Sequence, residues 1–195
     1  MCIRDRKEVG AACEHLIAAY RGDFLQSLIA ADPEVRHLPE LAWAREPFNR
    51  YRRYYLQALW YLAESTRLTG MHTPARQVLC YDQAASLYLT YAMALCTSTF
   101  DGKITLQRMI MSERALERSC LLYGALGDWE QVDKTFRAYE ACTQQVLEEK
   151  WEPDETLLRI VEDTKQCISC PRLEEYVVPE HAHTLPGHEV FHASY

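Results

Sequence analysis

The chain has 195 residues, of which 48% are hydrophobic and 25% charged, as expected of one globular domain that buries a core. Its formal net charge of −7 argues against a protein that holds nucleic acid by itself, because phosphate contacts need clustered lysines and arginines. No apolar run approaches the roughly 20 residues that cross a bilayer, and no signal-peptide pattern is present. We therefore expect a cytoplasmic protein without a membrane segment.

The first six residues, "MCIRDR", back-translate to a string that resembles an adapter used in sequencing libraries. We therefore interpret residues 1–10 as an adapter artefact followed by a truncated N-terminus. Residues 11–165 are predicted to form the folded domain, and residues 166–195 a tail rich in proline and histidine.

The first strong helical pattern covers residues 46–68, where apolar side chains recur every three or four residues. Gly70 is expected to end this helix in a left-handed conformation. The predicted core face consists of Phe48, Tyr51, Tyr55, Leu59 and Leu62.

A second helix is predicted to begin at Thr73, a possible cap, with Pro74 at its first position. Residues 86–96 are apolar nearly all round, so we expect this helix to be buried between neighbours. Its predicted core face is Cys80, Ala84, Leu87, Tyr91 and Leu95. Cysteines within such helical patterns are expected to pack as small buried hydrophobes; they are Cys80, Cys96, Cys120 and Cys142.

Asp101-Gly102 predicts a turn, after which three more helices follow. The first covers residues 108–127 and stops near Gly127. The second begins at Asp128, which has the spacing of a capping box with Gln131, and its core face is Val132, Phe136, Tyr139, Thr143 and Val146. The third is a short helix within residues 151–165, with Pro153 at its start.

No alternating apolar and polar run is long enough to predict a strand, so the predicted fold is all-α, built from antiparallel helix pairs. Residues 115–141 carry spacings typical of tetratricopeptide-type repeats. Such a pair cannot bury its apolar face alone, so it is expected to stack on the pair formed by residues 47–96.

Gly127 permits the sharp turn within the pair of residues 115–141, and Trp129 is expected to fill the seam between its two helices. On this interpretation Trp129→Ala costs about 3 kcal/mol or more through a cavity. The other side chains of the predicted seam are Leu122, Tyr123, Leu126, Val132 and Phe136.

Several motifs in order resemble the bacterial transcriptional activation domain, the tetratricopeptide-like domain of SARP-type and LuxR-type transcription regulators. They are "YRGDFL" from Tyr20, Trp43 followed by "YLQALWYLAE", then "ERAL", "LLYGALGD", "YEACTQQVLEEKWEPDET" and "LLRIVED". The resemblance covers roughly residues 11–165, and its last third is the most specific part.

The resemblance implies a helical activation and interaction domain that follows a winged helix-turn-helix domain in longer regulators. We expect it to act through protein partners: the upstream DNA-binding domain, RNA polymerase or a second copy of itself. DNA is then contacted only through the upstream domain, which is missing here. The alternative is a free-standing tetratricopeptide-like adaptor unrelated to transcription, and an in-frame helix-turn-helix upstream would separate the two.

Two motifs within the domain have competing interpretations. "RGD" at Arg21–Asp23 matches an adhesion tripeptide, but within "YRGDFL" a turn at Gly22 and a core anchor at Phe24 are favoured. "NRYRRYY" could stack nucleic-acid bases between Arg50, Arg52 and Arg53. We favour a helix whose tyrosines face the core and whose arginines face water, with docking onto an acidic partner as another use.

The tail matches a common zinc-finger spacing through Cys167, Cys170, His183 and His188, with His181 and His192 nearby. Prolines lie before and between the histidines, where a zinc finger needs a helix, so we favour a solvated tail. The chain shows no phosphate-binding loop, nucleophile elbow or His-Glu-x-x-His motif. We accordingly predict a protein that is not an enzyme and assign no catalytic, cofactor-binding or metal-binding residue.

Overall fold

The computed structural model describes residues 3–20, 34, 38–96, 105–145 and 151–166. Every regular element within these residues is a helix, which confirms the all-α prediction. The α-helices are α1 (Ile3–Ala19), α3 (Arg45–His72), α4 (Gln77–Cys96), α5 (Leu106–Ala125), α6 (Trp129–Gln144) and α7 (Glu155–Gln166); the 3-10 helices are η2 (Pro39–Ala44) and η3 (Pro74–Arg76). Helix α1 runs unbroken across the predicted boundary between residues 10 and 11.

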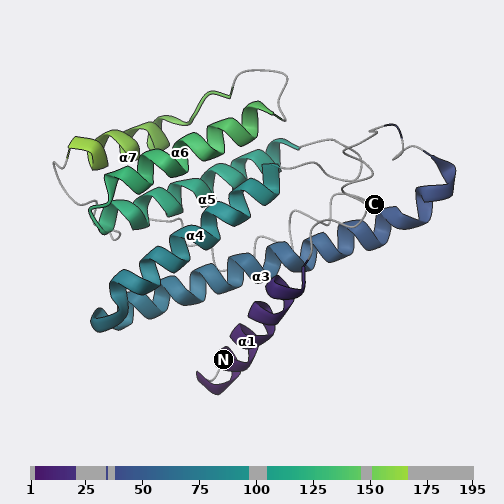
Figure 1. Cartoon of the computed structure of the whole chain (residues 1–195), viewed down its shortest axis with the longest axis horizontal. Coiled ribbons are helices and arrows are strands. Elements are labelled where there is room, and N and C mark those ends of the chain that lie inside the picture. The colour runs from purple at the N-terminus through teal and green to yellow at the C-terminus, as the bar shows by residue number, and fades with distance from the viewer. Residues whose placement is uncertain (1–2, 21–33, 35–37, 97–104, 146–150, 167–195) are drawn as a thin grey trace.

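Helices α3, α4, α5 and α6 run up and down beside one another, α7 lies on α5 and α6, and α1 packs against α3 (Figure 1). The α4–α5 pair is antiparallel and closely packed. The hydroxyl of Ser112 donates to the carbonyl of Ala92 (2.6 Å), and the hydroxyl of Ser119 donates to that of Ala85 (2.8 Å). Helix α4 therefore joins the α3–α4 hairpin to the α5–α6 hairpin. Tetratricopeptide-type stacking of these hairpins stays a prediction.

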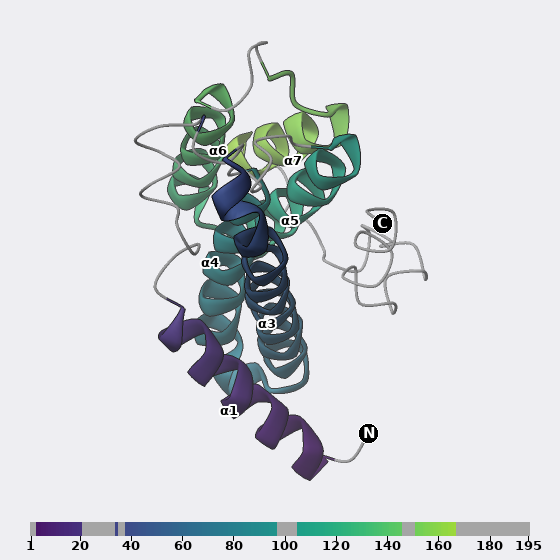
Figure 2. The same ribbon diagram turned by 90° about the vertical axis from the view of Figure 1, so that its right-hand side faces the viewer.

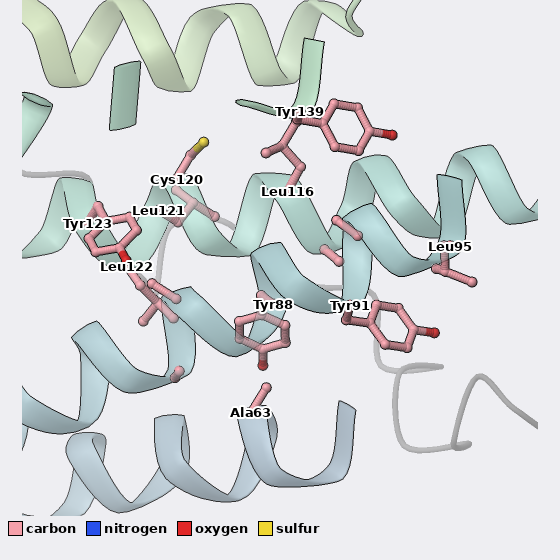
Figure 3. Close-up of a cluster of buried hydrophobic side chains, with 14 of the residues drawn as sticks. Ala63, Tyr88, Tyr91, Leu95, Leu116, Cys120, Leu121, Leu122, Tyr123 and Tyr139 are labelled. Atoms are coloured by element: carbon pink, nitrogen blue, oxygen red, sulfur yellow. The ribbon is translucent and has the colours of Figure 1, made fainter. Parts of the chain in front are cut away.

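The core forms where α3, α4 and α5 meet, and small side chains let these helices approach closely. Trp60 of α3 packs against Tyr88 and Tyr91 of α4, with ring centroids 5.5 and 5.2 Å apart. In Figure 3, Tyr88 points from α4 toward Ala63 of α3. Five alanines in this core are fully buried and form what we call the alanine seam: Ala63, Ala84, Ala85, Ala92 and Ala115.

Four of the five residues predicted for the core face of the second helix, now α4, are buried, and Leu87 is half-buried. Within residues 86–96, only Ser86 and Thr90 are exposed, as expected for a helix between neighbours. The cysteine prediction also holds for α4 and α5, because Cys80, Cys96 and Cys120 are buried free thiols.

The α3–α4 turn corrects two predictions about helix ends. Helix α3 continues past Gly70 to His72, and Gly70 is not left-handed. This position needs glycine for a different reason, since a Cβ here would lie only 2.7 Å from Cδ1 of the buried Tyr81 ring. Thr73 makes no capping hydrogen bond with its side chain, and Pro74 opens the short η3 helix, so α4 begins only at Gln77.

The α5–α6 turn follows the prediction from local sequence. Gly127 adopts a φ of 72°, which favours glycine over residues with a side chain. The amide of Asp128 donates to the carbonyl of Tyr123 (3.0 Å), and the amide of Gly127 to that of Gly124 (2.9 Å), the two bonds of a Schellman motif. The Asp128 carboxylate then caps α6 by accepting from the amide of Gln131 (3.1 Å).

The predicted seam of the α5–α6 pair is wrong at one residue. Trp129 is 50% exposed, because it occupies the first position of α6, where the chain leaves the turn and the side chain points to water. Val132 and Tyr139 are buried as predicted, and Phe136 packs at the edge of the core.

The tryptophan that closes the core beside α6 is Trp151, which was not predicted to be structural. It is 5% exposed, and its ring lies 5.5 Å from Phe136 and 4.9 Å from Tyr139, centroid to centroid. Its indole Nε1 donates to Oε1 of Glu113 on α5 (2.6 Å). Trp151 therefore ties α5, α6 and the segment that leads into α7 together.

The short helix is present as predicted, but α7 begins at Glu155, two residues after Pro153, which was predicted to stand at its start; it buries Leu157 and Ile160. Asp154 precedes its first turn and accepts from the amide of Thr156 (2.7 Å). This hydrogen bond lowers the pKa of Asp154, so it stays ionised near neutral pH.

Glu117 on α5 makes the stability of the fold depend on pH. Burial, and then the negative charge of Asp154, raise its pKa to about 7 from the ordinary value of 4.5; Glu113 adds to the rise and Arg114 opposes it. A carboxyl group whose pKa is raised in the folded state contributes stability that is fully present at pH values below its pKa in the unfolded chain. For Glu117 this contribution is lost as pH rises through about 7.

We therefore expect the stability advantage of wild type over Glu117→Gln to be larger at about pH 5 than at about pH 8. Urea unfolding of both proteins, followed by circular dichroism at the two pH values, measures it. Since all other titrating groups are shared, an equal difference at both pH values would contradict the assignment.

Several predictions concern residues outside the described part of the chain: the turn at Asp101-Gly102, Val146, the "RGD" motif and the tail from residue 167 onward. Within the described residues, no helix combines the length and the apolar character needed to cross a membrane.

Candidate interaction surface

The N-terminal end of α3, together with η2, extends past the ends of α4 and α5 (Figure 1). Arg52 marks where the overlap with α4 ends, because its guanidinium donates to the carbonyl of Ala94, two residues before that helix stops. Turned by 90°, the molecule shows the same end of α3 well away from α1 (Figure 2). Within this end of α3, Phe48 and Arg52 are buried, whereas Arg50, Tyr51 and Tyr54 are exposed.

Large aromatic side chains occupy the solvent side of this segment. Trp43 is 64% exposed, Tyr51 56% and Tyr54 48%. Helical spacing places Glu46, Arg50 and Tyr54 one turn apart in a row along α3, with Tyr51 beside that row. Trp43 lies just before α3, in η2. We call this set the α3 outer face: Trp43, Glu46, Arg50, Tyr51 and Tyr54.

The structure corrects the predicted orientation of "NRYRRYY". Tyr51 was predicted to face the core but is exposed, whereas Arg52 was predicted to face water but is only 6% exposed. The physical reason lies at the end of α4, where the carbonyl of Ala94 and the negative end of the helix dipole offer Arg52 a partner. The tyrosine that does turn inward is Tyr55, whose ring stacks on that of Tyr20, 3.9 Å away.

Arg52 is thus a structural residue that anchors the C-terminal end of α4. Burial, and then the charge of nearby Arg108, lower its pKa to about 9, while Tyr55 opposes the shift. Arg52 is therefore still a cation at neutral pH, and it is not exposed to a partner.

The charges that remain on the surface here are balanced. Arg50 pairs with Glu46 one turn earlier (3.5 Å), and its guanidinium lies 6.0 Å from the centre of the Tyr51 ring. The exposed charged residues between positions 39 and 50 are Glu40, Arg45, Glu46 and Arg50, two acidic and two basic. Such a surface offers little net positive charge for phosphate, so its composition does not favour nucleic acid.

A second polar cluster lies where α3, α4 and α5 meet, and its contacts are internal. Glu64 pairs with both Arg118 and Arg67, and the Arg118 guanidinium lies 4.6 Å from the centre of the Trp60 ring. Burial lowers the pKa of Arg118 to about 10, so the cation persists at neutral pH. These contacts tie the three helices together.

Two buried thiols, Cys96 and Cys120, are poor nucleophiles because burial raises the pKa of each. Cys96 lies between the hydroxyls of Ser112 (3.0 Å) and Tyr139 (3.2 Å), and burial raises its pKa. Burial raises the pKa of Cys120 to about 12. Both are therefore protonated at neutral pH, and a thiol is a far weaker nucleophile than a thiolate.

Across the part of the chain that the structure describes, no three His, Cys, Asp or Glu side chains gather closely enough to hold a metal ion. The tail residues with zinc-finger spacing, Cys167, Cys170, His183 and His188, lie outside that part. No protein-family model, curated protein or solved structure matches the chain.

Proposed function

We propose that this chain is the interaction domain of a bacterial cytoplasmic transcription regulator and works by protein contact, without catalysis. DNA binding belongs to a domain upstream of it in the regulator. The proposal combines the motif resemblance over residues 11–165 with one structural observation, the α3 outer face.

The α3 outer face has the composition of a contact surface. Tyrosine, tryptophan and arginine are the residue types that contribute most often to the binding energy of protein interfaces. Here they lie on η2 and α3, and the other side of α3 buries Phe48 and Leu56, both 3% exposed, of which Leu56 belongs to the hydrophobic core. A rigid helix that presents aromatic side chains loses little conformational freedom when a partner binds.

The test is a reporter assay in bacteria. The chain is fused to a monomeric heterologous DNA-binding domain whose operator precedes a weak promoter. We expect the fusion to raise transcription above the DNA-binding domain alone, and Tyr51→Ala/Tyr54→Ala to remove most of that increase. Matched controls are Val78→Ala and Leu158→Ala, which shorten side chains exposed by 69% and 47% on other helices.

A fusion that never exceeds the DNA-binding domain alone, with equal protein levels, would contradict the regulator proposal and favour the free-standing adaptor. Equal loss in the double tyrosine variant and in the controls would instead show that the α3 outer face is not the contact surface.

A further inference from the structure

The α3 outer face carries its charges in an order that suits pairing with itself. Glu46 precedes Arg50 by one helical turn, with exposed fractions of 69% and 46% for the two side chains. When a helix meets its own copy across a two-fold axis, the two run antiparallel, and each contact occurs twice. An acidic residue one turn before a basic one then lies level with the basic residue of the other helix.

We propose that the α3 outer face pairs antiparallel with the same face of a second copy of this chain, with the two-fold axis crossing that face at the level of residue 48 along the helix. In this register Glu46 of each copy lies beside Arg50 of the other. The inference rests on the proposed function for the choice of surface and adds the identity of the partner.

The aromatic residues fit the same register. An axis at the level of residue 48 brings Trp43 of one copy level with Arg53 of the other, one residue from Tyr54, and places Tyr51 level with the other copy's Arg45, one residue from Glu46. All three aromatic side chains are at least 48% exposed in the single chain. Pairing would therefore bury apolar area at both ends of the contact, with the charged pairs between them.

The charge balance favours a second copy over other partners. The exposed charges between residues 39 and 50 cancel, and the half-buried Arg53 adds a single positive charge, so an acidic protein or nucleic acid gains little net attraction. A copy of the same surface does gain one, because Glu46 of each copy meets Arg50 of the other. This end of α3 projects past the ends of α4 and α5 (Figure 1).

The experiment is sedimentation velocity of the full chain over a concentration series. We expect wild type to dimerise. Glu46→Arg and Arg50→Glu should each weaken the dimer about 100-fold, since each creates two symmetric like-charge contacts of about tenfold apiece. An equimolar mixture of the two variants should dimerise again. In the mixed dimer one chain is basic at both positions and the other is acidic at both, so opposite charges meet at each contact.

Recovery of the dimer in the mixture must come from contacts between chains, because each variant still lacks the Glu46–Arg50 pair within its own helix. The double reversal Glu46→Arg/Arg50→Glu keeps a pair within the helix and should dimerise like wild type, which covers the case in which a single variant folds poorly. Glu130→Lys is the matched control, since Glu130 forms an exposed pair with Lys134 one turn away on α6 (2.9 Å).

Three results would overturn the inference: a wild-type chain that stays monomeric throughout, a dimer that the single variants leave unchanged, or a mixture that does not recover. The reporter assay keeps this outcome apart from the proposed function. A monomeric chain that still activates transcription through Tyr51 and Tyr54 would remove the dimer and leave the function. A dimer that never activates transcription would contradict the proposed function and leave the pairing of two copies in place.

Discussion

Trp151→Ala is expected to lower the free energy of unfolding by about 3–5 kcal/mol, the usual cost of truncating a buried tryptophan. The indole is 5% exposed and packs on Phe136 and Tyr139, so its removal leaves a cavity between α5 and α6. It also removes the donor 2.6 Å from Oε1 of Glu113. The loss is a large fraction of the about 5–15 kcal/mol that stabilises a typical domain.

Two matched variants separate the contributions. Trp151→Phe keeps an aromatic ring and loses the hydrogen bond, so we expect a smaller loss of about 1–2 kcal/mol. Trp129→Ala removes the same side chain from a position that is 50% exposed and should cost under about 1 kcal/mol. Urea unfolding followed by circular dichroism measures all three, and equal midpoints for Trp151→Ala and Trp129→Ala would contradict the packing described for Trp151.

Arg118→Ala should lower the free energy of unfolding by about 2–3 kcal/mol, less than the loss of a fully buried ion-pair partner. Arg118 is 14% exposed, and its guanidinium contacts Glu64 and the Trp60 ring and lies 3.5 Å from the hydroxyl of Tyr88. Truncation removes these contacts at once. Glu64 keeps its second pair with Arg67 at 2.9 Å, which limits the loss.

The control for Arg118→Ala is Arg137→Ala. Arg137 lies 2.7 Å from Asp133 on α6, but its side chain is 74% exposed, so we expect a change of at most about 0.5 kcal/mol. Thermal unfolding at low and high salt measures both variants. A loss for Arg118→Ala that disappeared at high salt would contradict a shielded contact, because only exposed pairs are strongly screened.

Features set by neighbouring residues were predictable from the sequence. The end of α5 at Gly127 and the start of α6 at Asp128 depend on backbone conformation and a cap within a few residues, and both predictions are confirmed. The apolar period of residues 86–96 likewise predicted a helix with neighbours on most sides.

Features set by distant residues were not predictable. Gly70 looks like a helix end, yet its role depends on the ring of Tyr81 across the α3–α4 turn. Trp151 and Trp129 are equally apolar in sequence. Contacts of Trp151 with Glu113, 38 residues earlier, and with the rings of Phe136 and Tyr139 separate the buried one from the exposed one.

The sequence predicted where the candidate surface lies along the chain, but not which side chains it exposes. The arginine- and tyrosine-rich segment was identified, but its inner and outer faces were exchanged at residues 51 and 52. Tyrosine and arginine both combine an apolar body with a polar tip, so periodicity alone assigns them weakly. The carbonyl of Ala94, 42 residues away, decides that Arg52 turns inward. Tyr54, on the exposed side, was not singled out.

The alanine seam has a consequence for how this sequence can change over evolutionary time. Ala63, Ala84, Ala85, Ala92 and Ala115 are fully buried on three different helices, so the space between them is shared by α3, α4 and α5. A methyl group gained on one helix can be accommodated without strain only by a matching loss on another. Among related chains, side-chain volumes at these positions should therefore covary, with a nearly constant total even where no single alanine is retained.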